Sequence, residues 1–280
     1  MRMGTRLAAA ALVLLAAACG TASGPDHVTA VPSPPVSVDP MALVGSWRVQ
    51  LAGRDVGVLW IAEGMTLFQD CGGLDASWKA SHDGGFVAYS SSGDGSCFKS
   101  NKSLLPSWVH EAQGFRVQGD DRTLVDTDGR VLVTLLPGGH PQIPSTRSRE
   151  PYATTPTPSP KLAERMAAPA PVPAGMTPVT YGTLTGKRWE APDNPRAFLE
   201  FRQDGAFEGS DGCNGEGGRF SLGSSGEILA VAGSSTLIGC QNSAVGGWLQ
   251  EAHRVAIDKD QLVLLDAAAH ELGRLRPSSP

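Results

Sequence analysis

Short runs of alternating apolar and polar residues recur in the last third of the chain and predict small antiparallel strands. Residues 198–201 alternate into a Gln-Asp-Gly turn at 203–205, and the alternation returns at 206–209, which predicts a hairpin. The same reasoning predicts further strands at 220–222 and 228–231, and a late pair at 261–265 and 271–275.

One stretch in this region has a helical period instead. The apolar residues Val245, Trp248, Leu249, Ala252 and Val255 would form one face of a helix, with Asn242 or Ser243 as its cap. We expect this helix to cover the open face of the sheet.

The first half of the chain has a similar rhythm. Strands are predicted at 58–61, 65–68 and 86–89, with a hairpin of 123–126 and 131–135 that turns at Asp128-Gly129. A short helix is predicted after Pro106.

Five landmarks recur between the halves at offsets of 140 to 143 residues, which indicates tandem copies of one fold. The pairs are Trp47 with Trp189, Cys71 with Cys213, Cys97 with Cys240, Trp108 with Trp248, and Glu111 with Glu251. The predicted fold class is therefore mainly β (α+β): two tandem small antiparallel β-sheet modules, each with one packed helix.

The composition along the chain suggests the domain boundaries. Residues 1–18 read as a signal peptide and 19–42 as a flexible stalk, because the stalk has too few apolar residues to form a core. The modules are expected at 43–137 and 181–277, and residues 138–180 are expected to form a Pro-rich, semi-rigid linker.

The N-terminus predicts export and lipid attachment. Arg2 and Arg6 precede an apolar run at 7–18 that is too short to span a bilayer, and Cys19 follows it. Residues 15–20, Leu-Ala-Ala-Ala-Cys-Gly, resemble the lipobox of bacterial lipoproteins, although the usual Leu is displaced by one place. That resemblance implies a diacylglyceryl group on Cys19 and stable membrane attachment. The alternative is an ordinary signal peptide with a chance cysteine.

Charge and composition exclude some partners. The net charge is −5 and no basic stripe is interleaved with aromatic residues, so nucleic acid is not an expected partner. The Gly-, Ala- and Pro-heavy composition is similar to that of actinobacterial proteins.

Four cysteines remain after Cys19, and an exported chain permits disulfides. The expected pairs are Cys71 with Cys97 and Cys213 with Cys240, because each lies within one half. Free thiols and a metal site are the alternatives, and the metal site is disfavoured because neither pair has C-x-x-C spacing.

The last hundred residues resemble a known family. Thr185-Gly186-Lys187-Arg188-Trp189, Gly212-Cys213-Asn214, Thr236 with Cys240 four residues later, and a following helix with Glu251 resemble the META domain of HslJ-like envelope proteins. The resemblance extends loosely to residues 44–136, where the Asn and the Thr-x-x-x-Cys are missing. It implies a compact β-rich fold, an exported location and an association with stress tolerance, but no established reaction.

Candidate chemistry is sparse. Ser96 and Lys99 fit Ser-x-x-Lys, but the motif lacks its usual companions and helix start. The histidines at 82, 110, 140, 253 and 270 mostly sit beside turns or on polar faces, and Glu111 and Glu251 each lack a paired acid. We expect no enzyme activity, no cofactor and no metal.

The functional expectation is therefore a binding protein. We expect a membrane-anchored, extracytoplasmic lipoprotein with tandem META-like modules that bind an envelope protein or a small ligand, possible ligand-lining residues being Asn214, Thr236 and Glu251. In the alternative interpretation, these residues only fix a turn and a crosslink. Other functional alternatives are an inhibitor of a hydrolase or protease that inserts the loop 233–239, and a stabiliser of envelope proteins under stress.

Overall fold

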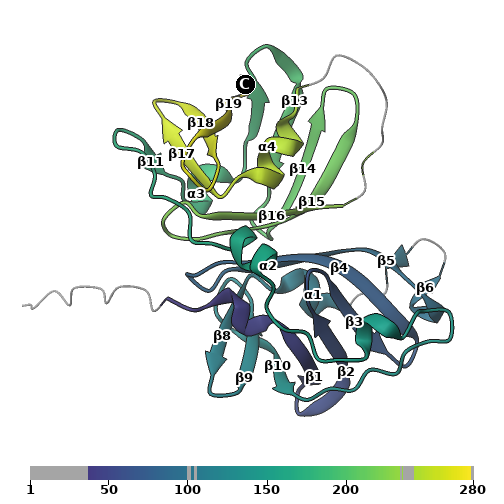
Figure 1. The fold of residues 1–280 in the computed structure, drawn as a ribbon. Helices are drawn as coiled ribbons and strands as arrows, with labels where there is room; N and C mark the ends of the chain where they lie inside the picture. The colour runs from purple at the N-terminus through teal and green to yellow at the C-terminus, as the bar shows by residue number, and fades with distance from the viewer. Residues whose placement is uncertain (1–36, 100–101, 104–105, 234, 236–242, 279–280) are drawn as a thin grey trace, which may run out of the picture. The chain divides into compact units, whose positions relative to one another are not determined.

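The fold is described from a computed structural model of the 280-residue chain, for residues 37–99, 102–103, 106–233, 235 and 243–278. The prediction of a mainly β protein with antiparallel sheets is confirmed. Figure 1 shows its helices as short elements beside two large sheets.

The first sheet has eight strands in the order β5-β4-β3-β2-β1-β10-β9-β8. Its strands are β1 (Gly45–Leu51), β2 (Arg54–Ile61), β3 (Met65–Gln69), β4 (Gly72–Ala80), β5 (Phe86–Gly93), β8 (Gly114–Gln118), β9 (Asp121–Val125) and β10 (Val131–Pro137). The sheet curls until its two outer strands approach each other, with a bridge between Gly85 and Gly114. The short elements of this half are η1 (Pro40–Leu43), η2 (Gly95–Cys97), β6 (Phe98–Lys99), β7 (Lys102–Ser103) and α1 (Ser107–Glu111).

The second sheet has nine strands in the order β11-β17-β18-β19-β12-β13-β14-β15-β16. Its strands are β11 (Thr177–Pro178), β12 (Arg188–Ala191), β13 (Asn194–Phe201), β14 (Ala206–Asp211), β15 (Gly215–Leu222), β16 (Ile228–Ala232), β17 (Arg254–Asp258), β18 (Gln261–Leu265) and β19 (Glu271–Pro277). It curls until β16 approaches β17, with a bridge between Glu227 and Arg254. Its helices are α3 (Tyr181–Leu184) and α4 (Val245–Glu251).

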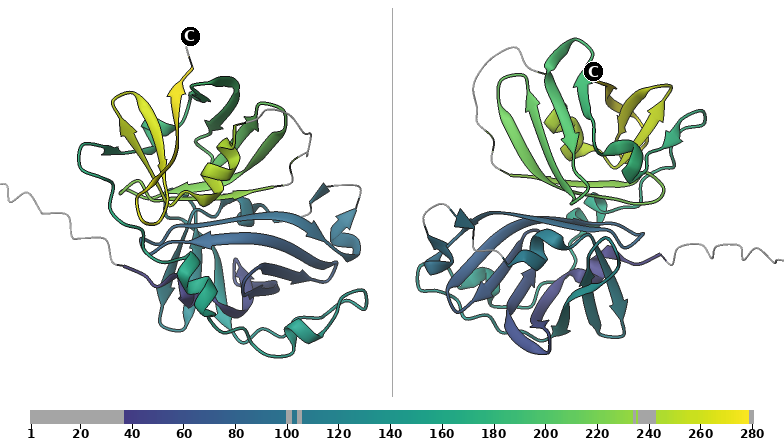
Figure 2. Two further views of the ribbon diagram at one scale, coloured as in Figure 1. Left: turned by 45° about the horizontal axis from the view of Figure 1, so that its top comes forward. Right: turned by 180° about the vertical axis from the view of Figure 1, so that it is seen from behind.

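The helix α4 is shorter than the sequence predicts. It begins after Ala244, which makes no side-chain cap, so Ser243 is not the cap, and Asn242 lies outside the described residues. It ends at Glu251, and Val255 belongs to β17 instead. Figure 2 shows α4 in the opening of the curled sheet, where Val245 and Leu249 are buried in the core. Burial of this apolar face, with no cap observed, holds the helix in place.

If β11 is set aside and the second sheet is read from β16 to β17, the two sheets have the same strand order. Several side-chain hydrogen bonds also recur at corresponding positions. The Trp47 ring nitrogen donates to the Leu43 carbonyl at 2.8 Å, and that of Trp189 donates to the Leu184 carbonyl at 3.0 Å. Each tryptophan thereby ties a short helical turn to the first strand of its half. Both indoles are buried in the core of their half.

The turns before the last strands match too. Asp126 Oδ1 accepts from the Arg130 amide at 2.9 Å, and Asp266 Oδ1 accepts from the His270 amide at 2.8 Å. Such side-chain to backbone bonds are typical of turns that Asp residues stabilise.

The segment predicted as a Pro-rich linker carries structure of its own. It contains η3 (Glu150–Tyr152) and α2 (Pro160–Arg165), and Figure 1 shows this teal segment running over the strands labelled β1 to β3 before α2. Leu162 and Met166 are buried in the core of the first half. Further on, the Ala170 carbonyl accepts from Arg254 Nε at 2.6 Å, a contact to the second half. The segment therefore packs against both halves.

Candidate functional site

Cys71 and Cys213 lie just before the corresponding strands β4 and β15. A disulfide joins Cys71 to Cys97, whose Cα atoms are 4.9 Å apart, which is the pairing that the sequence favours. Cys213 is also disulfide-bonded, and Cys240 lies outside the described residues.

Asn214, one of the predicted ligand-lining residues, is buried in a turn before β15. Its side-chain nitrogen donates to Asp211 Oδ2 at 2.9 Å, while Asp211 Oδ1 accepts from the Asn214 amide at 2.6 Å. These bonds fit the alternative interpretation, in which the motif fixes a turn. Glu251 is exposed at the end of α4, and Thr236 lies outside the described residues. A ligand-lining role for these three residues stays a prediction.

Two other predicted features fall wholly or mostly outside the described residues: the lipidation site Cys19, and the loop 233–239, of which only Gly233 and Ser235 are described. Within the described ranges, no helix is long and apolar enough to cross a membrane. The same residues include no group of three or more His, Cys, Asp or Glu placed to hold a metal ion.

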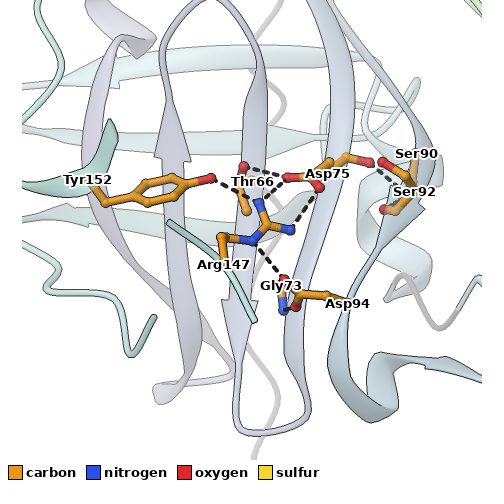
Figure 3. Close-up of polar contacts among 8 residues, drawn as sticks. All are labelled: Thr66, Gly73, Asp75, Ser90, Ser92, Asp94, Arg147 and Tyr152. Carbon is orange, nitrogen blue, oxygen red and sulfur yellow. Dashed lines mark hydrogen bonds and ion pairs between the residues drawn. The ribbon is translucent and has the colours of Figure 1, made fainter. Parts of the chain in front are cut away.

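An extensive polar cluster lies on the outer face of the first sheet, around Arg147. Figure 3 shows this side chain reaching from the segment after β10 to carboxylates at β4 and β5. Its two terminal nitrogens donate to Asp75 Oδ1 and Oδ2 at 2.7 and 2.8 Å, and Nε donates to Asp94 Oδ2 at 2.7 Å. A bidentate ion pair of this kind fixes the relative orientation of the two side chains as well as the distance between them.

The partners of Arg147 are themselves held in place. Thr66 Oγ1 donates to Asp75 Oδ1 at 2.8 Å, and the Gly73 amide donates to Asp94 Oδ1 at 2.7 Å. Burial disfavours the charged form of Asp75, but the bonds from Arg147 and Thr66 outweigh burial and lower its pKa. The bond to Asp75 raises the pKa of Arg147, so the pair is charged at neutral pH.

Aromatic packing attaches the same segment a second time. The Tyr152 ring makes edge contacts with Trp60 and Phe68, with centroids 5.4 and 4.9 Å apart, and its hydroxyl accepts from Arg147 at 2.9 Å. The Arg147 guanidinium also lies 5.7 Å from the Phe68 ring centroid. Tyr152 therefore helps to cover apolar rings that point away from the core.

Beside this attachment lies a groove of about 570 Å³, within the usual size range of small-ligand sites. It is lined by apolar side chains of β2 and β3, namely Val56, Val58 and Phe68. Its polar lining residues are Arg48, Asp55, Gln69, Asp70, His140 and Gln142. The segment after β10 thus contributes His140 and Gln142 to one side of the groove.

The side of the groove formed by His140 and Gln142 is anchored at both ends. Ser46 Oγ donates to the Gly139 carbonyl at 2.5 Å at one end, and Arg147 binds Asp75 and Asp94 at the other. We call residues 138–152 the strap, because they cross the outer face of the sheet between these anchors.

Sequence reasoning missed both the strap and the groove. The prolines of this segment predict a solvated spacer, and no local partner marks Arg147 as buried. The one available signal is Tyr152, the only aromatic residue between 138 and 180, in a stretch otherwise poor in large apolar side chains.

The comparisons with known proteins cover the second half. The family model described as META domain matches residues 180–279. No curated protein and no solved structure matches the chain. The resemblance read from the motifs of the second half is therefore confirmed at the level of the META domain.

Proposed function

We propose that the chain is a membrane-anchored envelope lipoprotein whose two halves are META-fold modules that bind a partner or small ligand without catalysis. The observation that carries this proposal is the shared strand order of the two sheets, one of which coincides with the META match. A duplicated binding unit gains effective concentration when both copies engage one target.

The paired contacts support duplication beyond the strand order. Matching tryptophan bonds at Trp47 and Trp189 and matching Asp turns at Asp126 and Asp266 occupy corresponding places in the two halves. These contacts connect different elements, so their recurrence reflects one common arrangement. The first half is accordingly proposed as a second META-fold module that has lost the Asn of the Gly-Cys-Asn motif.

The META match supports a non-catalytic role at the cell envelope, since that is the character of the family. Cys19 supports the anchor, because its place after an apolar run matches the processing site of lipoproteins. The strap supports recognition, since it fixes a groove of ligand size on the outer face of the first sheet.

The anchor is tested by metabolic labelling of cells with an alkyne palmitate analogue, followed by fractionation. The wild type should carry the label and sediment with membranes, whereas Cys19→Ser should lose the label and leave the membrane fraction. Equal labelling and sedimentation of the two proteins would contradict the anchor.

The binding role is tested separately, with isolated cell envelopes and purified mature protein. Saturable retention that an excess of unlabelled protein displaces is the expected result. Absence of retention would contradict the binding role.

A further inference from the structure

We propose that the groove between the strap and strands β1 to β3 is a binding site for a neutral oligosaccharide. The inference rests on the proposed binding function and assigns its ligand class. It starts from the chemistry of the side chains that line the groove.

The polar lining combines hydrogen-bond donors and acceptors. Arg48 brings donors, Asp55 and Asp70 bring acceptors, and the amides of Gln69 and Gln142 bring both. Sugar hydroxyls also donate and accept, so they can satisfy such a mixed set of groups. The half-buried side chains of Val56 and Val58 offer a small apolar surface for the C–H groups of a sugar ring.

Charge argues against an anionic ligand. With His140 neutral, one arginine and two aspartates give the groove a formal charge of −1. Arg48 is already paired with Asp55, at 3.2 Å. A phosphate, a nucleic acid or an acidic glycan would therefore meet net repulsion.

Backbone pairing argues against an extended peptide added as a strand. The strands β1, β2 and β3 lie inside the sheet, with a paired neighbour on each side. A peptide that binds by strand addition needs an exposed sheet edge, which this face does not offer. Recognition here must come from side chains.

The groove is held in shape before any ligand arrives. Gln69 Nε2 donates to the Val56 carbonyl at 3.2 Å, which sets the direction of its amide. His140 and Gln142 lie in the strap, between the Ser46 bond to Gly139 and the Arg147 attachment. Fixed groups lower the ordering cost of binding, which matters for ligands that gain little from each hydroxyl.

The test is titration of the full mature protein with maltotetraose, N-acetylchitotetraose and the anionic tetragalacturonate, followed by ligand-detected NMR and calorimetry. Saturable binding of at least one neutral tetrasaccharide, with weaker or no binding of tetragalacturonate, is expected. No binding by either neutral probe at millimolar concentration would overturn the assignment, and so would preferential binding of tetragalacturonate.

Variants locate the site. Arg48→Met and Gln142→Ala should each weaken binding about tenfold, the effect expected for a lost hydrogen bond to ligand in the stronger part of the usual range. The matched controls Arg54→Met and Gln118→Ala remove side chains that do not line the groove and should bind as the wild type does. Wild-type affinity in both groove variants would overturn the placement.

Folding and the wider function are monitored separately. Arg48 is about half exposed, so its variant should melt as the wild type does, and Gln142→Ala provides an independent second probe. Both groove variants could still be retained on isolated envelopes, with no displacement by neutral oligosaccharides. That result would contradict the saccharide site but not the proposed binding function. If the wild-type protein itself is not retained on isolated envelopes, the proposed binding function is contradicted.

Discussion

Replacing Arg147 by methionine should destabilise the first half of the chain. The side chain is only 15% exposed, and it pairs with Asp75 and Asp94, which are 35% and 22% exposed. Methionine keeps much of the apolar stem but leaves two half-buried carboxylates without their cation.

The size of the effect follows from two limits. Breaking a fully buried pair costs about 3 to 5 kcal/mol, whereas an exposed pair contributes about 0 to 1 kcal/mol. The partners of Arg147 lie between these limits, so we expect a loss of about 2 to 3 kcal/mol in the free energy of unfolding.

Urea unfolding, followed by tryptophan fluorescence, measures this loss as a shift in midpoint at constant slope. Arg149→Met is the matched control, because Arg149 is an exposed arginine in the same strap, and it should leave the midpoint unchanged. In a double-mutant cycle, Arg147→Met should cost less free energy of unfolding in the Asp75→Asn background than in the wild type. The reason is that it then leaves one carboxylate without a cation instead of two. A loss below about 0.5 kcal/mol for Arg147→Met would refute the reasoning.

Acid should reduce the difference between wild type and Arg147→Met. The pKa of Asp75 is lowered in the folded protein, so its stabilising contribution is present above its unfolded pKa of about 4 and is lost as pH falls through the folded value. The two unfolding curves should therefore converge at low pH. A difference that stays constant down to pH 2 would contradict the charge-based account.

Three further changes test other parts of the fold. Gly273→Ala should destabilise the second half by about 1 to 3 kcal/mol, because a Cβ there would come within 2.5 Å of the Trp248 ring, and an unchanged melting temperature would contradict this. Removing the disulfide with Cys71→Ser and Cys97→Ser together should lower the free energy of unfolding in urea by about 3 kcal/mol. Reductant should then destabilise the wild type more than the variant, and an equal effect on both would contradict this. Burial raises the pKa of Glu227 to about 7, so its contribution to stability is full below pH 4.5 and declines as pH rises to about 7. Glu227→Gln should therefore flatten the dependence of melting temperature on pH in this range, and an unaltered slope would refute the prediction.

The sequence predicts the hairpins well because their signals are local. The alternation around residues 198–209 and 220–231 corresponds to β13 with β14 and to β15 with β16. The sequence prediction lacks all of β4 and the start of β15, which begin at Gly72, Gly73 and residues 215–218, where glycines replace the side chains that strand patterns require. Their pairing is set by neighbouring strands, which no local pattern records.

The strap could not be predicted for a related reason. Arg147 lies 72 residues from Asp75 and 53 from Asp94 along the chain, so nothing near it reveals its partners. Composition predicts the average behaviour of a Pro-rich segment, and here a few long-range bonds override it.

The strap also determines where the first half can be cut. A fragment that ends at Pro137 would lose Tyr152 from its contacts with Trp60 and Phe68 and would leave these rings uncovered, and it would lose the buried Leu162 as well. Such a fragment should tend to aggregate, whereas one extended through residue 166 keeps these side chains covered. A failed expression trial of the shorter piece would reflect its missing cover and would not show that this half needs the rest of the protein to fold.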